Sequence, residues 1–374
     1  MKNGTIVIET QFLYDYNYPE KGITVGGTQR YALELANLIR ELNYDVVFIT
    51  KAKINSEITY DDFGKVISYN SKFGNLGNSN FSKRVYNYAN KIKADLVIYS
   101  DILVSLNKKY EKSIAIQHGI AWDNPYENKL KSYILNKQYI KATLKHDKVV
   151  CVDTNFINWM REKSKKYFKK PDRLIYIPNF ADESIFSYST EKYGSLEYKL
   201  LYPRRLVKHR GFNIFTEMCL ELINEGFNVV PVYAIDESNK DILYSQYPKL
   251  KDIKHILAFP KMSKIHEYYS EAYLTFVPTI WSEGTSLSAI ESIMSGCPVI
   301  VSDVGGLSNI VIDGFNGYVL PPTIKAFKEK TKEIIANPAL RDKLKENCII
   351  MRESFGLKKW KTEITKIIRS VLER

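Results

Sequence analysis

Residues 277–298 read VPTIWSEGTSLSAIESIMSGCP, a stretch in which a short apolar run passes through small polar residues into a helical pattern. Leu287, Ile290 and Met294 follow the spacing of one apolar helix face, and Glu291 falls on that same face. The loop before such a helix exposes backbone N–H groups that can bind phosphate oxygens. The stretch therefore predicts a strand, a loop that can bind an anion, and a helix.

Two acids, Glu283 in the loop and Glu291 in the helix, decide how this stretch is interpreted. A carboxylate within an apolar stripe is costly unless a partner satisfies it. Glu291 could therefore bind a ligand, or it could lie at the edge of the stripe and point into solvent. The spacing alone leaves both interpretations open. Together with the amides at the helix start, two ligand-binding acids would suit a nucleotide-sugar.

The sequence from Glu283 to Glu291 has the form E-G-x-S-L-x-x-x-E, which resembles the E-x7-E motif of family 4 glycosyltransferases. Residues 295–322, SGCPVIVSDVGGLSNIVIDGFNGYVLPP, are similar to the segment that follows this motif in the family. The resemblance implies a retaining, hexosyltransferase-type enzyme that uses a nucleotide-sugar donor. It implies neither a metal nor a cofactor, and the chain has no DxD motif.

Strand-like and helical patterns alternate along the chain, which predicts parallel α/β sheets. The strand-like runs fall into two series, which predict two Rossmann-like domains: 5–9, 45–50, 65–69, 94–100, 113–119 and 148–154, then 198–206, 228–235, 253–259, 273–279 and 298–303. The resemblance identifies this as the GT-B fold, in which the two domains face each other across a cleft. We expect an acceptor-binding domain over 1–180, a nucleotide-sugar-binding domain over 181–355, and a helix over 356–374 that packs back on the first domain.

Two glycines and a histidine are the candidates in the first domain. Gly26 and Gly27 precede a helical pattern, where the backbone can approach a phosphate or sugar closely, although an ordinary turn would have the same sequence. His118 follows the strand-like run SIAIQ. By the resemblance, His118 contacts the donor sugar, and the alternative is a structural histidine.

Two arginines follow the first strand of the second domain. Arg205 and Arg210 lie five residues apart in a predicted strand-to-helix loop and could converge on one diphosphate, because a guanidinium binds phosphate oxygens in a fork. The family pattern here is G-R-L followed by K-G, and in this chain Arg204 stands in place of the glycine and Arg210 in place of the lysine. The alternative is a solvated basic loop.

Composition limits the class of protein. The 374 residues are 45% hydrophobic and 26% charged, as in globular domains, and no apolar run reaches the roughly 20 residues that span a bilayer. The four cysteines are widely spaced, which predicts neither a zinc site nor disulfides and favours a cytoplasmic location. The net charge is +12, but no nucleic-acid-binding signature accompanies it.

Positive charge is concentrated in residues 127–173, which contain 13 Lys and Arg against 5 Asp and Glu. Lys137, Lys141, Lys145 and Lys148 recur at helical spacing and predict one cationic helix face. We expect residues 129–170 to bind an anionic membrane surface, so that the enzyme associates peripherally with the inner face of the membrane. The alternative is a solvated charged face.

The resemblance assigns a function and a set of residues. A sugar would pass from a nucleotide-sugar to a hydroxyl of a glycan or lipid-linked glycan, as in the biosynthesis of cell-surface polysaccharide or glycolipid. The alternatives are a nucleotide-sugar epimerase of the same fold and a non-catalytic nucleotide- or membrane-binding protein. The catalytic candidates are Glu283, Arg205, Arg210 and His118. The donor-binding candidates are Gly26, Gly27, Arg205, Arg210, Glu283, Gly284, Thr285, Ser286, Leu287 and Glu291.

Overall fold

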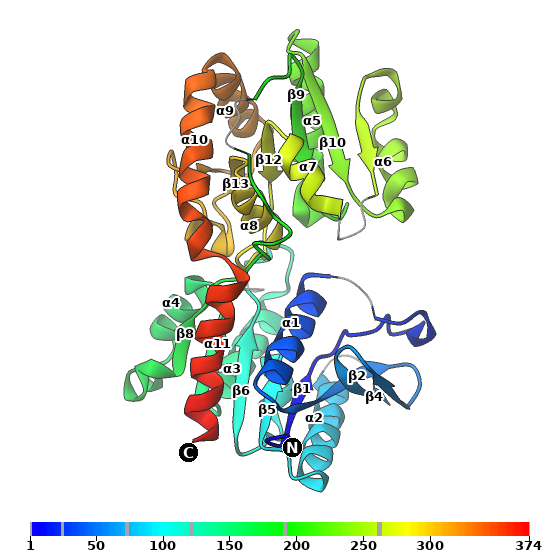
Figure 1. Cartoon of the computed structure of the whole chain (residues 1–374), viewed down its shortest axis with the longest axis vertical. Coiled ribbons are helices and arrows are strands. Elements are labelled where there is room, and N and C mark those ends of the chain that lie inside the picture. The colour runs from blue at the N-terminus through cyan, green and yellow to red at the C-terminus, as the bar shows by residue number, and fades with distance from the viewer. Residues whose placement is uncertain are drawn as a thin grey trace. The chain divides into compact units, whose positions relative to one another are not determined.

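The computed structural model of the chain describes residues 2–23, 26–71, 75–119, 123–189, 193–259 and 264–373. Its contacts divide the chain into two compact units, and Figure 1 labels most of their elements. The first unit comprises Met1–His118, Tyr126–Ile177 and Lys361–Arg374, and the second comprises Gly119–Pro125 and Pro178–Trp360.

The first unit is built on a sheet with the strand order β3-β4-β2-β1-β5-β6-β7-β8. Every neighbouring pair is parallel except β3 and β4, which are antiparallel. The strands are β1 (Thr5–Glu9), β2 (Asp45–Ala52), β3 (Ser56–Tyr60), β4 (Gly64–Asn70), β5 (Leu96–Tyr99), β6 (Ser113–Gln117), β7 (Lys148–Cys151) and β8 (Leu174–Tyr176). Its helices are α1 (Gly27–Glu41), α2 (Asn75–Lys91), α3 (Lys129–Thr143) and α4 (Thr154–Lys163).

The last helix, α11 (Leu357–Leu372), enters the first unit at Lys361. There it is anchored by an ion pair between Lys361 and Glu41 of α1 at 2.5 Å. Gly119 and residues 123–125, which the sequence predicts to lie in the first domain, belong by their contacts to the second unit. That difference could not be predicted from the order of the strands, because a short loop can pack on either neighbour.

The second unit contains a parallel sheet with the order β11-β10-β9-β12-β13-β14. Its strands are β9 (Tyr198–Tyr202), β10 (Val229–Ala234), β11 (Ile256–Ala258), β12 (Leu274–Val277), β13 (Val299–Ser302) and β14 (Gly317–Leu320). Its helices are α5 (Phe212–Asn224), α6 (Lys240–Gln246), α7 (Ile265–Glu271), α8 (Leu287–Met294), α9 (Ile324–Ala336) and α10 (Pro338–Met351). Both sheets are doubly wound, as the alternation in the sequence predicted.

The core of the second unit lies on both faces of its sheet. Leu200 and Tyr202 of β9 belong to one buried cluster with residues of α5, whereas Leu201 belongs to a second cluster with residues of α8. This is the alternation expected of a strand covered on both faces. Because helices cover both faces, ligands have access to such a sheet only at its edges and strand ends.

The strand β3 of the first unit was not predicted. The sequence of β3, SEITY, gives the burial pattern of an exposed edge strand, and it is antiparallel to β4. A strand that buries neither face has no apolar pattern to reveal it. Within the described residues, no helix has the length and apolar content to cross a membrane.

Candidate active site

Two loops at the carboxyl ends of β9 and β12 carry the candidate site of the second unit. The two strands are neighbours, and the strand order changes direction between them, because β10 and β11 lie on one side and β13 and β14 on the other. Ligands of open α/β sheets bind at such switch points. The loop after β9 provides Arg204 and Arg210, and the loop after β12 provides Glu283.

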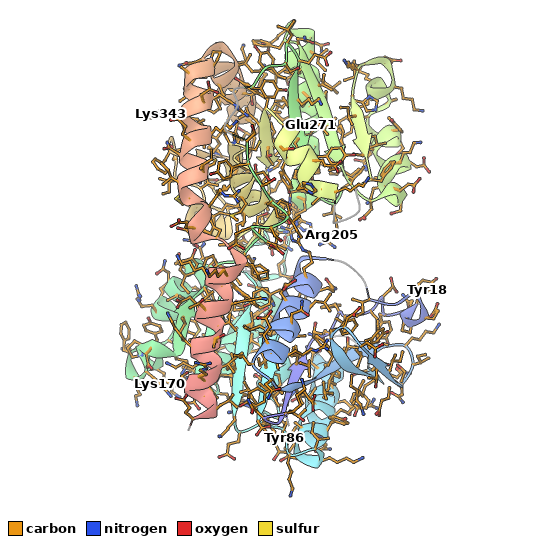
Figure 2. All side chains as sticks on the ribbon, in the orientation of Figure 1. Tyr18, Tyr86, Lys170, Arg205, Glu271 and Lys343 are labelled. Carbon is orange, nitrogen blue, oxygen red and sulfur yellow. The ribbon has the colours of Figure 1, made fainter. Side chains whose placement is uncertain are left out.

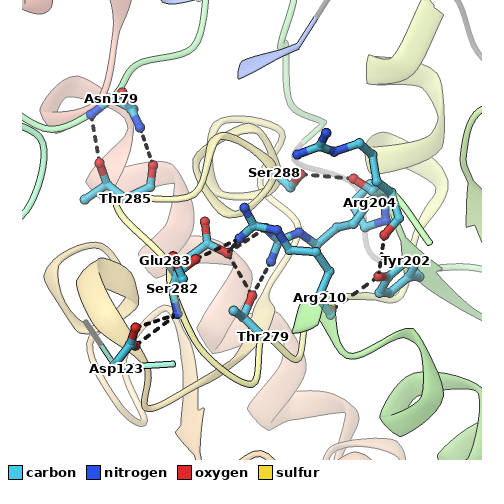
Figure 3. Close-up of polar contacts among 12 residues, drawn as sticks. Asp123, Asn179, Tyr202, Arg204, Arg210, Thr279, Ser282, Glu283, Thr285 and Ser288 are labelled. Carbon is cyan, nitrogen blue, oxygen red and sulfur yellow. Dashed lines mark hydrogen bonds and ion pairs between the residues drawn. The ribbon is translucent and has the colours of Figure 1, made fainter. Parts of the chain in front are cut away.

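The carboxylate of Glu283 lies at the centre of this site and is only 7% exposed. Its Oε2 atom accepts hydrogen bonds from Arg204 Nη2 at 2.6 Å, from Thr279 Oγ1 at 2.8 Å and from Arg210 Nη1 (Figure 3). Its other oxygen, Oε1, accepts no hydrogen bond from any residue that the structure describes. One oxygen is therefore anchored three times, and the other is left for a ligand.

Opposing effects set the charge of Glu283. Burial raises the pKa of its carboxyl, but the positive charges of Arg204 and Arg210 outweigh burial and leave that pKa below its ordinary value. Glu283 is therefore ionised at neutral pH. A buried carboxylate of this kind is stable only while its cations and hydrogen bonds remain in place.

The backbone around Glu283 is held in a strained conformation. Ser282 has a φ of 60°, in the left-handed region, and its N–H donates to both carboxylate oxygens of Asp123 at 3.0 Å. The carbonyl of Glu283 accepts from Gly306 N at 3.1 Å. A Cβ atom at Gly305 would lie 1.9 Å from that carbonyl, so only glycine fits there. These contacts fix the glutamate before any ligand binds.

The residues at the start of α8 make contacts within the second unit. Thr285 Oγ1 accepts from Asn179 N at 3.0 Å, and Ser288 donates to the carbonyl of Pro203 at 3.0 Å. Ser286 is the N-cap residue of α8, but its side chain makes no capping hydrogen bond. The backbone amides of the first turn are therefore not capped by a side chain, and they begin at Leu287. Such amides bind anions well.

Gly284 and Glu291 lie on either side of that helix start. A Cβ atom at Gly119 would lie 2.9 Å from Gly284 N, so these two glycines allow a close backbone approach. Glu291 is 4% exposed and accepts a hydrogen bond from Tyr269 of α7 at 2.7 Å. The interpretation in which Glu291 points into solvent is therefore wrong.

A second arginine, Arg204, joins Arg210 at Glu283. Arg204 and Arg210 converge on Glu283, whereas the side chain of Arg205 is exposed (Figure 2). Consecutive residues in an extended turn point to opposite sides, so only one of the two neighbouring arginines can face Glu283. Arg204 stands at a glycine position of the family pattern and was given no role from the sequence, and Asp123 was not predicted. The signal in the sequence was a charged residue, Arg204, at a position where the family pattern has glycine.

The first unit has its own group of candidates. Gly26 is the N-cap residue of α1 and Gly27 its first residue. Tyr31, in the next turn of α1, packs edge-on against the ring of His118, with a centroid distance of 4.9 Å. His118 Nε2 also lies 3.1 Å from Ser100 Oγ. Burial lowers the pKa of His118 to about 4, so its imidazole is neutral at physiological pH.

The described part of the chain contains no group of three or more His, Cys, Asp or Glu residues placed to hold a metal ion. The four cysteines, Cys151, Cys219, Cys297 and Cys348, are buried and free. The absence of a metal and a cofactor from the reaction stays a prediction.

Comparison with protein families assigns the second unit. Residues 191–350 match the model of the family described as glycosyl transferases group 1. The second unit therefore carries a group 1 glycosyltransferase domain. The chain is also 26% identical over 243 residues to the uncharacterized glycosyltransferase MJ1178 of Methanocaldococcus jannaschii, an alignment that covers 64% of each protein. It thus spans a little less than two thirds of the length of that relative.

Solved structures identify the fold of the whole chain. Sucrose-phosphate synthase from Thermosynechococcus elongatus superposes with a TM-score of 0.79 at 16% identity, covering 99% of this chain and 100% of that one. HepE of Anabaena, solved in complex with UDP, superposes with a TM-score of 0.73 at 13% identity, covering 99% of this chain and 100% of that one. The chain has the GT-B fold of these proteins.

Proposed function

We propose that the chain is a retaining glycosyltransferase of family 4, with Glu283 and Glu291 as its E-x7-E pair. The observation that carries the proposal is the state of Glu283, which is ionised and anchored through Oε2, with Oε1 left without a partner among the described residues. This carboxylate lies just before the uncapped first turn of α8. A carboxylate that can accept hydrogen bonds from sugar hydroxyls and backbone amides that can bind phosphate thus lie together in a group 1 domain.

The proposed roles follow from charge. The diphosphate gains negative charge as the C1–O bond of the donor breaks, and Arg205, Arg210 and the amides from Gly284 to Leu287 would stabilise it. Glu283 would accept hydroxyls of the sugar through Oε1, and Glu291 would accept those of the ribose. The known complex of HepE with UDP makes a uridine nucleotide the first donor to test.

We propose a front-face displacement without a metal or cofactor. The bond between C1 and the phosphate oxygen breaks, the bond between C1 and the acceptor oxygen forms on the same face, and the acceptor proton passes to the leaving diphosphate. Configuration at C1 is therefore retained. In the first unit, Gly26, Gly27 and neutral His118 remain proposed donor contacts.

The acceptor is proposed to be a glycan or a lipid-linked glycan at a cytoplasmic membrane surface. Helix α3 supports this proposal, because Leu130 is 68% exposed, Tyr133 59% and Ile134 46%, beside exposed Lys137 and Lys141. An exposed apolar face flanked by lysines suits an anionic bilayer surface.

The cationic face of α3 is smaller than the sequence predicted. The ammonium of Lys145 donates to the carbonyl of Leu106, and Lys148 pairs with Asp172 at 2.9 Å. These two lysines therefore stabilise the first unit and are not available to a membrane.

Donor binding provides the test of the proposed function. We expect UDP-sugars or another nucleotide-sugar among GDP-, dTDP- and CMP-sugars to raise the melting temperature, because a ligand of the folded state stabilises it. Glu283→Gln should abolish turnover, whereas Glu267→Gln, an exposed acid in the same unit, should not. The failure of all these donors to bind would overturn the proposal. Release of free sugar or a changed sugar without any acceptor would point to the epimerase.

A further inference from the structure

Arg204 is the residue of the site that the proposed reaction leaves without a role. Its Nη1 atom donates to Thr279 Oγ1 and its Nη2 atom donates to Glu283 Oε2 at 2.6 Å. Its side chain is only 8% exposed. A guanidinium buried in this way is already committed to protein groups and offers little surface to a ligand.

Arg210 has two competing partners. Its Nη1 atom donates to Glu283 Oε2 and to the carbonyl of Ser282. The proposed function also requires Arg210 to bind the diphosphate of the donor. Once Arg210 turns to the diphosphate, Glu283 keeps a cation only if a second arginine stays in place.

The planar fork of Arg204 fits that requirement. One arm holds Thr279 and the other holds Glu283, while Thr279 itself donates to the same Oε2 atom at 2.8 Å. The three side chains form a closed triangle of hydrogen bonds that does not involve Arg210 (Figure 3). A lysine has one point of charge and no fixed fork, so it could not hold both partners in this geometry.

We propose that Arg204 is a positioning residue: it anchors Oε2 of Glu283, so that Oε1 stays directed at the donor sugar while Arg210 moves to the diphosphate. This inference rests on the proposed function for the identity of the ligand. It assigns Arg204 no contact with substrate. Arg204, in place of the usual glycine, thus binds the carboxylate of Glu283 and not the diphosphate of the donor.

Several charged and titratable groups surround Glu283 and determine how far its pKa changes when the charge of Arg204 is removed. They come from the loop after β9, from the loop containing Asp123 and from the end of β9: Arg204, Arg210, His209, Asp123 and Tyr202. The charges of Arg204 and Arg210 lower the pKa of Glu283 most, and hydrogen bonds from Arg204 and Thr279 lower it further. Replacing Arg204 by an uncharged side chain should therefore raise that pKa.

The first measurement is made on the ligand-free protein. The carboxyl carbons of glutamate are labelled with ¹³C, and the signal of Glu283 is identified by its loss in Glu283→Gln. We expect the midpoint of its titration to rise by at least one pH unit in Arg204→Met and by less in Arg204→Lys. The control is Lys208→Met, an exposed cation of the same loop, which should leave the midpoint unchanged. An unchanged midpoint in Arg204→Met would overturn the inference, whatever the enzyme transfers.

The second measurement uses turnover and nucleotide binding. We expect Arg204→Met to lower kcat by tenfold or more, to move the acid limb of its pH profile upward, and to change the Kd of UDP by less than twofold. In Glu283→Gln, the further change Arg204→Met should have little effect, because both act through one carboxylate. Loss of UDP affinity in Arg204→Met would instead place Arg204 on the diphosphate. Inactivity of the wild-type protein toward every donor would count against the proposed function. The ¹³C titration would then still test whether Arg204 anchors Glu283.

Discussion

At the scale of single residues, Arg210 is the cation whose loss is expected to matter most for the leaving group. We expect Arg210→Ala to lower turnover by about 100-fold, because removing one donor to a developing charge commonly costs about 3 kcal/mol. Arg210→Lys should lower turnover by a smaller factor, since lysine keeps the positive charge. Steady-state kinetics with the donor found by the binding screen measures both.

The exposed neighbour Arg205 provides the comparison within the same loop. If Arg205 also binds the diphosphate, Arg205→Ala will lower turnover by a similar factor to Arg210→Ala. Near-normal kcat in both alanine variants would mean that the diphosphate binds elsewhere.

Glu291 allows a separate test of nucleotide recognition. Because its side chain is buried and accepts a hydrogen bond from Tyr269, it has a fixed orientation in α8. We expect Glu291→Gln to weaken binding of the donor and of the free nucleotide by about tenfold, the equivalent of 1.4 kcal/mol. Tyr269→Phe should weaken nucleotide binding by a smaller factor. Calorimetric titration with UDP measures both, and an equal loss of UDP affinity in Glu283→Gln would contradict the division of roles between the two acids.

At the scale of elements, buried His146 joins two parts of the first unit. Its Nδ1 lies 3.2 Å from Ser113 Oγ of β6, and its Nε2 lies 2.7 Å from Ser105 Oγ of a 3₁₀ helix, Ile102–Leu106. Burial, followed by the charge of Lys109, lowers the pKa of His146 from 6.5 to about 3. The imidazole is therefore neutral in the folded protein.

This depressed pKa predicts a loss of stability in acid. Below pH 6.5 the unfolded chain takes up a proton at His146 and the folded chain does not, so the free energy of unfolding falls by up to about 1.4 kcal/mol per pH unit. The contribution is fully present above pH 6.5 and is lost as the pH falls toward 3. Urea unfolding at several pH values measures it. We expect a smaller slope in His146→Gln, and an identical slope would contradict the assignment.

Helix α3 is the element expected to meet a membrane. We predict that the protein cosediments with anionic vesicles at low salt and not with neutral ones, because each lysine near an anionic leaflet contributes about 1 kcal/mol. Lys137→Glu with Lys141→Glu should abolish this binding and leave nucleotide binding intact. Leu130→Ser with Tyr133→Ser should weaken it without changing the charge.

A matched change of charge elsewhere serves as the control for α3. Lys240→Glu with Lys249→Glu reverses two exposed lysines of the second unit and should leave vesicle binding unchanged. If this pair weakens binding as much as the pair on α3, the attraction comes from net charge alone. If the wild-type protein does not bind anionic vesicles, α3 is only a charged face.

At the level of the whole molecule, most of α11, from Lys361 onward, belongs to the first unit although it is the last element of the chain. Ile364, Ile368 and Val371 of α11 are at most 3% exposed. We expect Ile368→Ala to destabilise the first unit by about 2–5 kcal/mol, the usual range for a buried isoleucine. Hydrogen exchange in β1 and β5 should accelerate, whereas exchange in β9 and β12 should change less. Lys366→Ala, at a position 64% exposed, is the control.

The two doubly wound sheets and the loops that carry the candidate site could be predicted from the amino-acid sequence alone. Strands such as 5–9 and 298–303 could be predicted because burial on both faces requires a continuous apolar run. Glu283 and Arg210 could be placed at strand ends because each follows such a run closely. The edge strand β3 was missed, since an exposed strand has no apolar pattern.

Which side chains meet was set by the tertiary structure. It selected Arg204 over Arg205 as the partner of Glu283, brought Asp123 to the amide of Ser282, and committed Lys145 to the carbonyl of Leu106. Each of these contacts joins residues at least 39 positions apart in the chain. Local periodicity depends on near neighbours, whereas the direction of a side chain in an irregular turn depends on the distant segment that packs against it.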